Sequence, residues 1–210
     1  GKYFSLPVYQ LLGGKYRDEG RIYLDCPAGD SLDCLDTLLQ PTKPSWAKNK
    51  NRYAETKEDL LGSAPARAKE MVSKGYDALK FDLDIPGSVF DSTTGYRLTK
   101  NDIDWMIRFM EEIRKAAGDA VDLAFDAHWR YHSQEIIEIA AACEQLHVLW
   151  LEDPCPPDDF EGLKYIRSHS QAPIGTGENL QLAAGFKKLI DENLADIITP
   201  DLQKAGGLLE

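Results

Sequence analysis

The sequence predicts an α/β fold in which about six strand–helix units follow one another. Short apolar runs alternate with longer amphipathic stretches along nearly the whole chain. Continuous apolar runs joined by helices are typical of a parallel sheet covered by helices. Two architectures fit this pattern: an open doubly wound sheet, or a (β/α)8 barrel, which typically needs about 250 residues and eight units. For a barrel, roughly two units would be missing after residue 210.

Each element is placed by its apolar period and by the residues at its ends. Gly75 and Gly118 follow two helical stretches, and glycine commonly ends a helix. Asn101 or Asp102 lies near the start of one helix, and Ser133 could cap another. Strands are expected at residues 21–26, 77–83, 121–127, 148–152, 173–177 and 196–199. Helices are expected at residues 60–74, 100–117, 133–145, 160–170 and 180–192.

The segment 27–57 differs from the rest of the chain. It has three prolines, many polar residues and Trp46, and it follows the first strand. In a barrel it would be a long loop at the rim where the strands end. Long loops of this kind are usually lids or disordered segments, and the sequence leaves both open.

Composition narrows the class of partner. The net charge of −11 disfavours binding to nucleic acid or to an anionic membrane. No apolar run is long enough to span a bilayer, and no basic-then-apolar leader is present. The four cysteines form no CxxC pair, which is expected of thiols in a reducing compartment. We therefore expect a cytoplasmic protein.

Three acids follow apolar runs at a regular spacing. Asp126, Glu152 and Glu178 lie 26 residues apart, about the length of one strand–helix unit. In a parallel barrel the strand ends meet at one rim, where active sites lie, and adjacent strands are about 4.8 Å apart. Three carboxylates brought together there repel one another unless a cation lies between them. Their hard oxygen atoms suit Mg²⁺ or Mn²⁺ rather than zinc.

Motifs around these positions resemble one family. The segments WLEDP (150–154), GTGEN (175–179) and PDLQKAGG (200–207) resemble the mandelate racemase subgroup of the enolase superfamily. The opening LPVYQLLGGKYRD (6–18) resembles the point where that family's N-terminal capping domain meets its barrel. The resemblance implies a (β/α)8 barrel at residues 21–210 and a lead-in at residues 1–20. It also implies that the capping domain and the last two units are absent from this chain.

The resemblance further implies a Mg²⁺ ion held by Asp126, Glu152 and Glu178, with Mn²⁺ as an alternative. The metal would bind the carboxylate of a small organic acid and stabilise the enediolate formed when a base removes the α-proton. An α-proton next to a carboxylate is a very poor acid. Neutralising the developing charge is therefore the large energetic contribution.

Acid–base residues are expected on the second and third strands. Relatives often carry Lys-x-Lys on the second strand, whereas this chain has Lys80 and then Asp82, which disfavours a racemase-type base there. Lys80 could be an electrophile, a base, or a structural partner of Asp82 or Asp84. His128 follows Asp126 by two residues, so strand alternation would put both on one face. This pattern resembles sugar-acid dehydratases such as galactonate and mannonate dehydratases, in which the third-strand histidine takes part in acid–base catalysis.

Further residues complete the predicted site. Asp201 matches the sixth-strand aspartate that pairs with a seventh-strand histidine in mandelate racemase-like enzymes, and that histidine is not in this sequence. Asn179 could also hold Glu178 in place. The residues expected to bind substrate are Asp82, Arg130, Asn179 and Lys204.

These features favour Mg²⁺-dependent dehydration of a sugar acid, an aldonate or aldarate, to a 2-keto-3-deoxy acid. The reaction would proceed by α-proton abstraction and β-elimination of water. The alternatives are a racemase or epimerase of a 2-hydroxy acid, and a barrel fragment that binds metal without turnover. A cycloisomerase is disfavoured because Asp201 stands where such relatives resemble one another in having lysine. The full-length protein is expected to be a homo-oligomer.

Overall fold

The computed structural model describes residues 1–26, 56–83 and 97–207. The loop expected at residues 27–57 lies almost wholly outside these ranges, so its role as a lid stays a prediction. Within the described part of the chain, no helix combines the length and the apolar character needed to cross a membrane.

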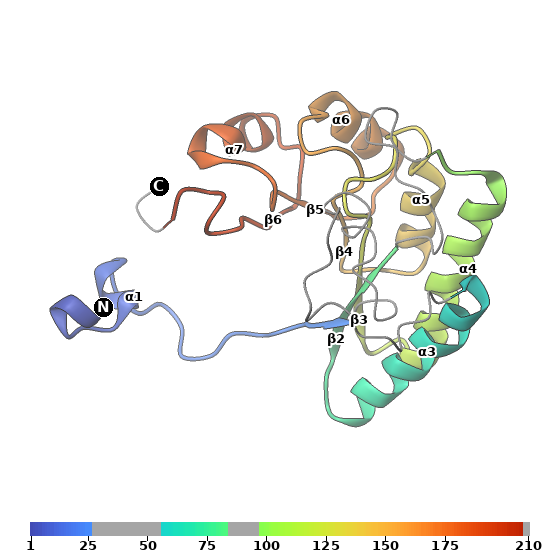
Figure 1. Cartoon of the computed structure of the whole chain (residues 1–210), viewed down its shortest axis with the longest axis horizontal. Helices are drawn as coiled ribbons and strands as arrows, with labels where there is room; N and C mark the ends of the chain where they lie inside the picture. The colour runs from blue at the N-terminus through green and yellow to red at the C-terminus, as the bar shows by residue number, and fades with distance from the viewer. Residues whose placement is uncertain (27–55, 84–96, 208–210) are drawn as a thin grey trace, which may run out of the picture.

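Six short strands form the sheet (Figure 1). All of them lie inside the ranges that the sequence predicts, and most are one or more residues shorter at each end. They are β1 (Leu24–Cys26), β2 (Ala78–Asp82), β3 (Asp122–Asp126), β4 (Trp150–Glu152), β5 (Ile174–Thr176) and β6 (Ile197–Ile198).

The helices that accompany the sheet follow the strands in sequence, as the alternating pattern predicts. The lead-in contains the short helices η1 (Lys2–Phe4) and α1 (Val8–Leu11), which Figure 1 shows away from the sheet. The division into lead-in and barrel stays a prediction. The helices of the barrel are α3 (Lys57–Ser73), α4 (Lys100–Ala117), α5 (Ile137–Gln145), α6 (Phe160–His169) and α7 (Leu182–Asp191).

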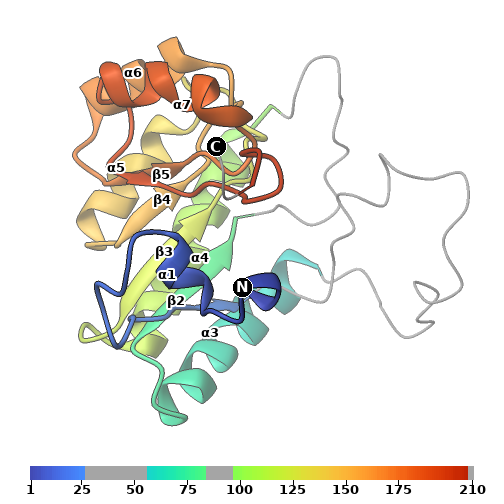
Figure 2. The same cartoon turned by 90° about the vertical axis from the view of Figure 1, so that its left-hand side faces the viewer.

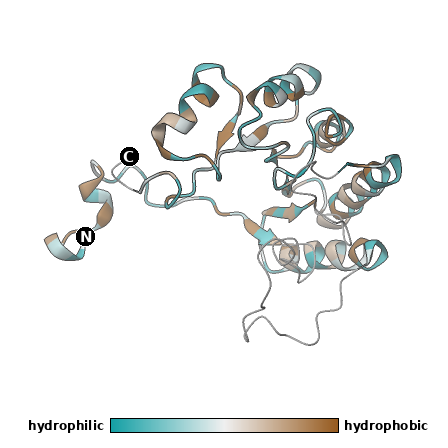
Figure 3. Ribbon diagram, turned by 45° about the horizontal axis from the view of Figure 1, so that its top comes forward, coloured by the Kyte–Doolittle hydropathy of each residue, from teal (hydrophilic) through white to brown (hydrophobic). Residues whose placement is uncertain are grey.

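The sheet has a single direction and a simple order. The six strands are parallel, and each pairs with the next in the sequence. Figure 2 shows β2 to β5 following one another across the molecule, and Figures 1 and 3 show α3 to α7 in an arc around the strands. A doubly wound sheet would instead reverse its strand order and carry helices on both faces. The predicted partial (β/α)8 barrel is therefore confirmed.

Alternate strand residues face the helices and form the core. Leu79 and Phe81 of β2, and Leu123 and Phe125 of β3, are almost completely buried. They belong to one hydrophobic cluster with the inner sides of the helices. Burial of this apolar surface is the main favourable contribution to folding. The helix α4 adds a stripe at helical spacing: Ile103, Met106, Phe109, Met110 and Ile113.

The predicted start of the third barrel helix is wrong. The sequence places it at residue 133 with Ser133 as a cap, but α5 begins at Ile137 and no side chain caps it. The preceding residues form turns instead, because the backbone N–H groups of Glu135 and Ile136 both donate to the carbonyl of His132. The polar residues before the apolar run therefore belong to the connection rather than to the helix.

The helices α3 and α4 begin with matching capping boxes. Thr56 and Asp59 cap α3, and Thr99 and Asp102 cap α4. Asp102 is thus the third residue of its helix, and Thr99 is the cap that the sequence analysis did not name. Asp102 is buried and also accepts a hydrogen bond from Lys57 Nζ at 2.5 Å, which ties the starts of the two helices together.

Asp102→Ala should destabilise the fold more than Asp59→Ala. Both substitutions break a capping box, but only Asp102 is buried and also paired with Lys57. We expect Asp102→Ala to lower the free energy of unfolding by roughly 2 to 4 kcal/mol, and Asp59→Ala to have a smaller effect. Urea denaturation followed by circular dichroism measures both losses. Equal losses would show that the contact between α3 and α4 adds nothing.

Candidate metal centre

The ends of β2, β3 and β4 place three acids in one row. In the ladder, Asp82 pairs with Asp126, and Asp126 pairs with Glu152. Paired residues of neighbouring strands project to the same face of a sheet. The three carboxylates therefore share the inner side of the barrel wall, opposite the core residues Phe81 and Phe125.

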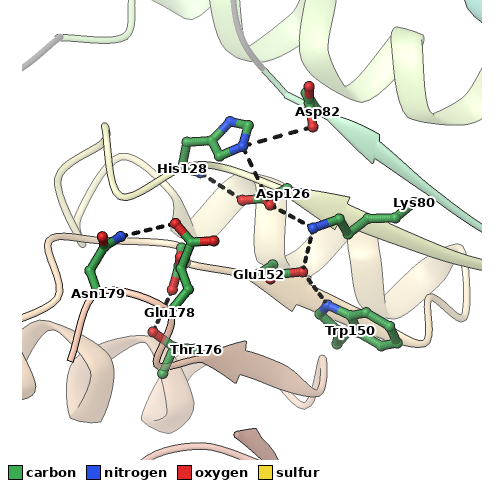
Figure 4. Close-up of polar contacts among 10 residues, drawn as sticks. Lys80, Asp82, Asp126, His128, Trp150, Glu152, Thr176, Glu178 and Asn179 are labelled. Atoms are coloured by element: carbon green, nitrogen blue, oxygen red, sulfur yellow. Dashed lines mark hydrogen bonds and ion pairs between the residues drawn. The ribbon is translucent and has the colours of Figure 1, made fainter. Parts of the chain in front are cut away.

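Lys80 carries the positive charge of this row. Its Nζ donates hydrogen bonds to Asp126 Oδ2 at 2.9 Å and to Glu152 Oε2 at 3.1 Å (Figure 4). Burial alone would lower the pKa of Lys80, but the charges of Asp126 and Glu152 outweigh burial and raise the pKa. Lys80 is thus held as a cation in this arrangement. That state suits an electrophile better than a base.

Glu152 is buried and held from two sides. Trp150 Nε1 donates to Glu152 Oε2 at 2.9 Å, beside the bond from Lys80. Gly175 leaves room for the indole, because a Cβ atom there would lie 2.6 Å from Trp150 Cδ1. Burial and then the charge of Asp126 raise the pKa of Glu152, and Lys80 offsets only part of this increase. A single lysine charge is shared by two carboxylates, so the group keeps a net negative charge.

The turn after β3 brings His128 back over Asp126. His128 and Trp129 have positive φ angles of 48° and 52°, so the chain leaves the strand path there. His128 N donates to Asp126 Oδ1 at 2.9 Å, and His128 Nε2 lies 3.5 Å from Asp126 Oδ2 and 3.9 Å from Asp82 Oδ1. His128 therefore lies beside Asp126 because of this turn rather than because of strand alternation. Arg130 is half-buried on the same turn.

Asp82, Asp126 and His128 form the tightest group of candidate ligands. Among acidic, histidine and cysteine side chains in the described ranges, these three alone offer ligand atoms within 4.8 Å of one another. Glu152 is linked to Asp126 through Lys80, whereas Glu178 lies beyond the end of β5. The predicted ligand set of Asp126, Glu152 and Glu178 stays a prediction.

A chain of hydrogen bonds joins Glu178 to the loop after β6. Asn179 Nδ2 donates to Glu178 Oε1 at 3.0 Å (Figure 4), and Lys204 Nζ donates to Asn179 Oδ1 at 2.9 Å. Asp201 Oδ1 accepts the backbone N–H groups of Gln203 and Lys204, which closes the turn of that loop. The fifth and sixth strand ends are thus connected through side chains that the sequence analysis had singled out separately.

Asp153 is a buried acid of this rim that the sequence analysis did not name. Thr176 Oγ1 donates to Asp153 Oδ1 at 2.6 Å, while Asp153 Oδ2 is buried with no hydrogen-bond partner in the described structure. Burial raises the pKa of Asp153 to about 7, the Thr176 bond opposes that increase, and the charges of Asp126, Glu178 and Glu152 add to it. Its position in the sequence, directly after Glu152 at the end of an apolar strand, could have identified Asp153 as a buried acid of the site.

The donors at this rim suit a divalent cation with hard oxygen ligands. The negative charge exceeds the positive charge, since Lys80 is the cation bonded to the central carboxylates. Burial is the main cause of the raised pKa values of Glu152 and Asp153, and the charges of neighbouring carboxylates add to the increase. A divalent cation would offset the repulsion, and carboxylate oxygens are the ligands that Mg²⁺ and Mn²⁺ prefer. The carboxylates that supply the negative charge of this rim are those of Asp82, Asp126, Glu152, Asp153 and Glu178.

Known proteins similar in sequence share this region. The family described as "Enolase C-terminal domain-like" matches residues 63–210. A D-xylonate dehydratase of Haloferax volcanii is 34% identical over 210 residues, which cover 100% of this chain and 45% of that protein. A D-gluconate dehydratase of Thermoproteus tenax is 32% identical over 203 residues, which cover 96% of this chain and 34% of that protein. The chain thus spans less than half the length of either relative.

A solved structure shares the fold. The crystal structure of a mandelate racemase/muconate lactonizing enzyme-like protein from Rubrobacter xylanophilus matches with a TM-score of 0.77 and 31% sequence identity. The match covers 100% of this chain and 50% of that one. The strand order and the row of strand ends described above are therefore features of a fold that occurs in a longer protein.

Asp153→Asn should remove a pH dependence from the stability of the metal-free chain. Since the pKa of Asp153 rises from 3.8 to about 7 on folding, the folded state favours the protonated carboxyl. This stability is fully present below about pH 3.8 and is lost progressively as the pH rises from there to about 7. In that pH range, we expect the free energy of unfolding of the parent to decrease by up to about 1.4 kcal/mol per pH unit more than that of the Asp153→Asn variant, which lacks this titrating group. Denaturation in EDTA at several pH values measures the difference, and parallel profiles would contradict it.

Proposed function

The chain belongs to the enolase C-terminal domain-like family, and on that premise we propose that it forms the barrel part of an enzyme that dehydrates a sugar acid. The observation that carries the proposal is the rim itself, where Lys80 lies between Asp126 and Glu152 and His128 lies over Asp126. A cation, an imidazole and clustered carboxylates are the groups that such an elimination needs. The names of the two dehydratase relatives support sugar acids as the substrate class.

Asp126, Glu152 and Glu178 would hold Mg²⁺, with Mn²⁺ as the alternative. The excess of carboxylate charge at the rim supports this assignment, because a single lysine, Lys80, is bonded to both Asp126 and Glu152. When bound, the cation would offset the negative charge that develops on the substrate carboxylate as the α-proton leaves. Asn179 would hold Glu178 through the bond already present.

His128 is the proposed acid of the elimination. Its Nε2 would give a proton to the β-hydroxyl, which leaves as water, while the electrons of the broken α C–H bond form a carbon–carbon double bond. The resulting enol gains a proton at C3, loses the proton of its C2 hydroxyl and so becomes a 2-keto-3-deoxy acid. Lys80 would contribute its positive charge beside the substrate. Asp201 would orient the base that takes the α-proton, as the family resemblance implies.

The remaining polar residues of the rim would bind the substrate. Asp82 lies beside His128, and Arg130 lies on the same turn, which supports a role for both in binding hydroxyl or carboxylate groups of the substrate. Asn179 and Lys204 are bonded to each other and would act as one unit. A cytoplasmic location, a homo-oligomeric assembly and the lack of nucleic-acid or membrane partners stay predictions.

Glu152→Gln should weaken Mg²⁺ binding by at least about tenfold, because the substitution removes a charged ligand from a site where each carboxylate contributes to affinity. Isothermal titration of Mg²⁺ into the protein gives the dissociation constant. Glu161→Gln is the matched control, since Glu161 is exposed on α6 and is not a proposed ligand. If Glu152→Gln binds Mg²⁺ as tightly as the parent and the control, the ligand assignment is wrong.

In the full-length protein, His128→Asn should lower the amount of keto acid formed from an aldonate with Mg²⁺ by about 100-fold or more, because it removes the proposed acid. Semicarbazide-reactive product measures dehydration, and solvent-deuterium exchange at the α-carbon measures proton abstraction separately. We expect exchange to persist in the variant. His169→Asn on the exposed end of α6 is the control.

The same assay separates the alternative activities. Exchange with inverted product and no keto acid in the parent protein would replace dehydration by racemisation or epimerisation. Mg²⁺ binding without exchange or product across a panel of aldonic and aldaric acids would leave a barrel that binds metal but does not turn over.

A further inference from the structure

Asp153 connects three successive strand ends. Its backbone N–H donates to the carbonyl of Gly175 at 2.9 Å, and its side-chain Oδ1 accepts from Thr176 Oγ1 at 2.6 Å, so two bonds tie it to β5. Its backbone carbonyl accepts the N–H of Trp129 at 2.7 Å, which ties it to the turn after β3. Asp153 itself follows the last residue of β4.

Each of these bonds ends next to a residue of the proposed site. Trp129 follows His128, Thr176 precedes Glu178 by two residues, and Asp153 follows Glu152. The positive φ of Asp153, 42°, shows that the backbone turns sharply at this point. A change in the Asp153 bonds would therefore shift His128, Glu152 and Glu178 relative to one another.

Stability does not account for an acid at this position. Asp153 is 2% exposed, its Oδ2 has no hydrogen-bond partner in the described structure, and three neighbouring carboxylates repel its charge. A buried acceptor left unpaired costs about 1 to 3 kcal/mol. The capping role that an aspartate in a loop often has is taken by Asp159, which accepts from the N–H of Gly162 at the start of α6. Unfavourable buried groups of this kind are found where a site requires them.

We propose that Asp153 is a positioning residue of the metal centre, which fixes the separation of Glu152 and Glu178 through its bond to Thr176 and holds the His128 turn through its bond to Trp129. This inference rests on the proposed ligand set. It adds a residue pair, Asp153 and Thr176, that would affect metal binding indirectly, by holding the ligands in position rather than by contacting the metal.

Thr176 provides the test, because it is buried, lies on the far side of the bond and is not a proposed ligand. Thr176→Val removes the hydroxyl and keeps the shape, whereas Thr176→Ser keeps the hydroxyl and serves as the matched control. We expect Thr176→Val to raise the Mg²⁺ dissociation constant by about 10- to 100-fold and Thr176→Ser to leave it within about twofold. Hydrogen exchange of the Trp129 amide should quicken in the valine variant alone.

Isothermal titration, with circular dichroism melting curves of the same samples, decides among the outcomes. A valine variant with a lower melting temperature but the parent's Mg²⁺ affinity would make the bond merely structural and overturn the inference, leaving the proposed function intact. If serine and valine weaken binding equally, the hydroxyl is irrelevant and the inference also fails. If the parent protein binds no Mg²⁺, the ligand assignment is wrong, and the proposed positioning role of Asp153 is then wrong as well.

Discussion

The ion pair that Lys80 shares with Asp126 and Glu152 is the interaction on which the rest of the rim depends. Buried charges are tolerated only when they are paired and hydrogen-bonded, and here a single ammonium group meets carboxylates from two other strands. Trp150 supports the same Glu152 oxygen. His128 is held to the other oxygen of Asp126 through its backbone N–H. The centre therefore requires β2, β3 and β4 to be in a fixed register.

Packing on the outer side of the sheet enforces that register. A shift of one residue would turn Phe81 and Phe125 away from the helices and bring Lys80 and Asp126 into the core. The apolar stripe of α4 belongs to the same hydrophobic cluster as these phenylalanines. The hydrophobic effect on one face thus positions charges on the other. The charges left unbalanced on that inner face are what make a divalent cation the expected ligand.

Sequence reasoning predicted the order of the elements better than it predicted their contacts. Continuous apolar strands identified the barrel, because strand alternation and unit length follow from local sequence. The spacing of the acids also put Asp126 and Glu152 at neighbouring strand ends, whereas Glu178 as the third ligand stays a prediction. The turn at His128, the absence of a cap at Ser133 and the role of Asp153 were not predictable in that way. The His128 turn and the contacts of Asp153 depend on distant segments, through the bonds that Trp129 and Thr176 donate to Asp153. The missing cap at Ser133 instead reflects local turns whose N–H groups donate to the His132 carbonyl.

The central claim is that one divalent cation binds among Asp126, Glu152 and Glu178. A crystal structure of the protein grown with Mn²⁺, read from the anomalous scattering of the metal, tests it most directly. We expect a single Mn²⁺ peak in contact with all three carboxylates. We also expect Lys80 Nζ to have moved away from its present position between Asp126 and Glu152. A peak held instead by Asp82, Asp126 and His128, the tightest group of ligand atoms in the described residues, would contradict it.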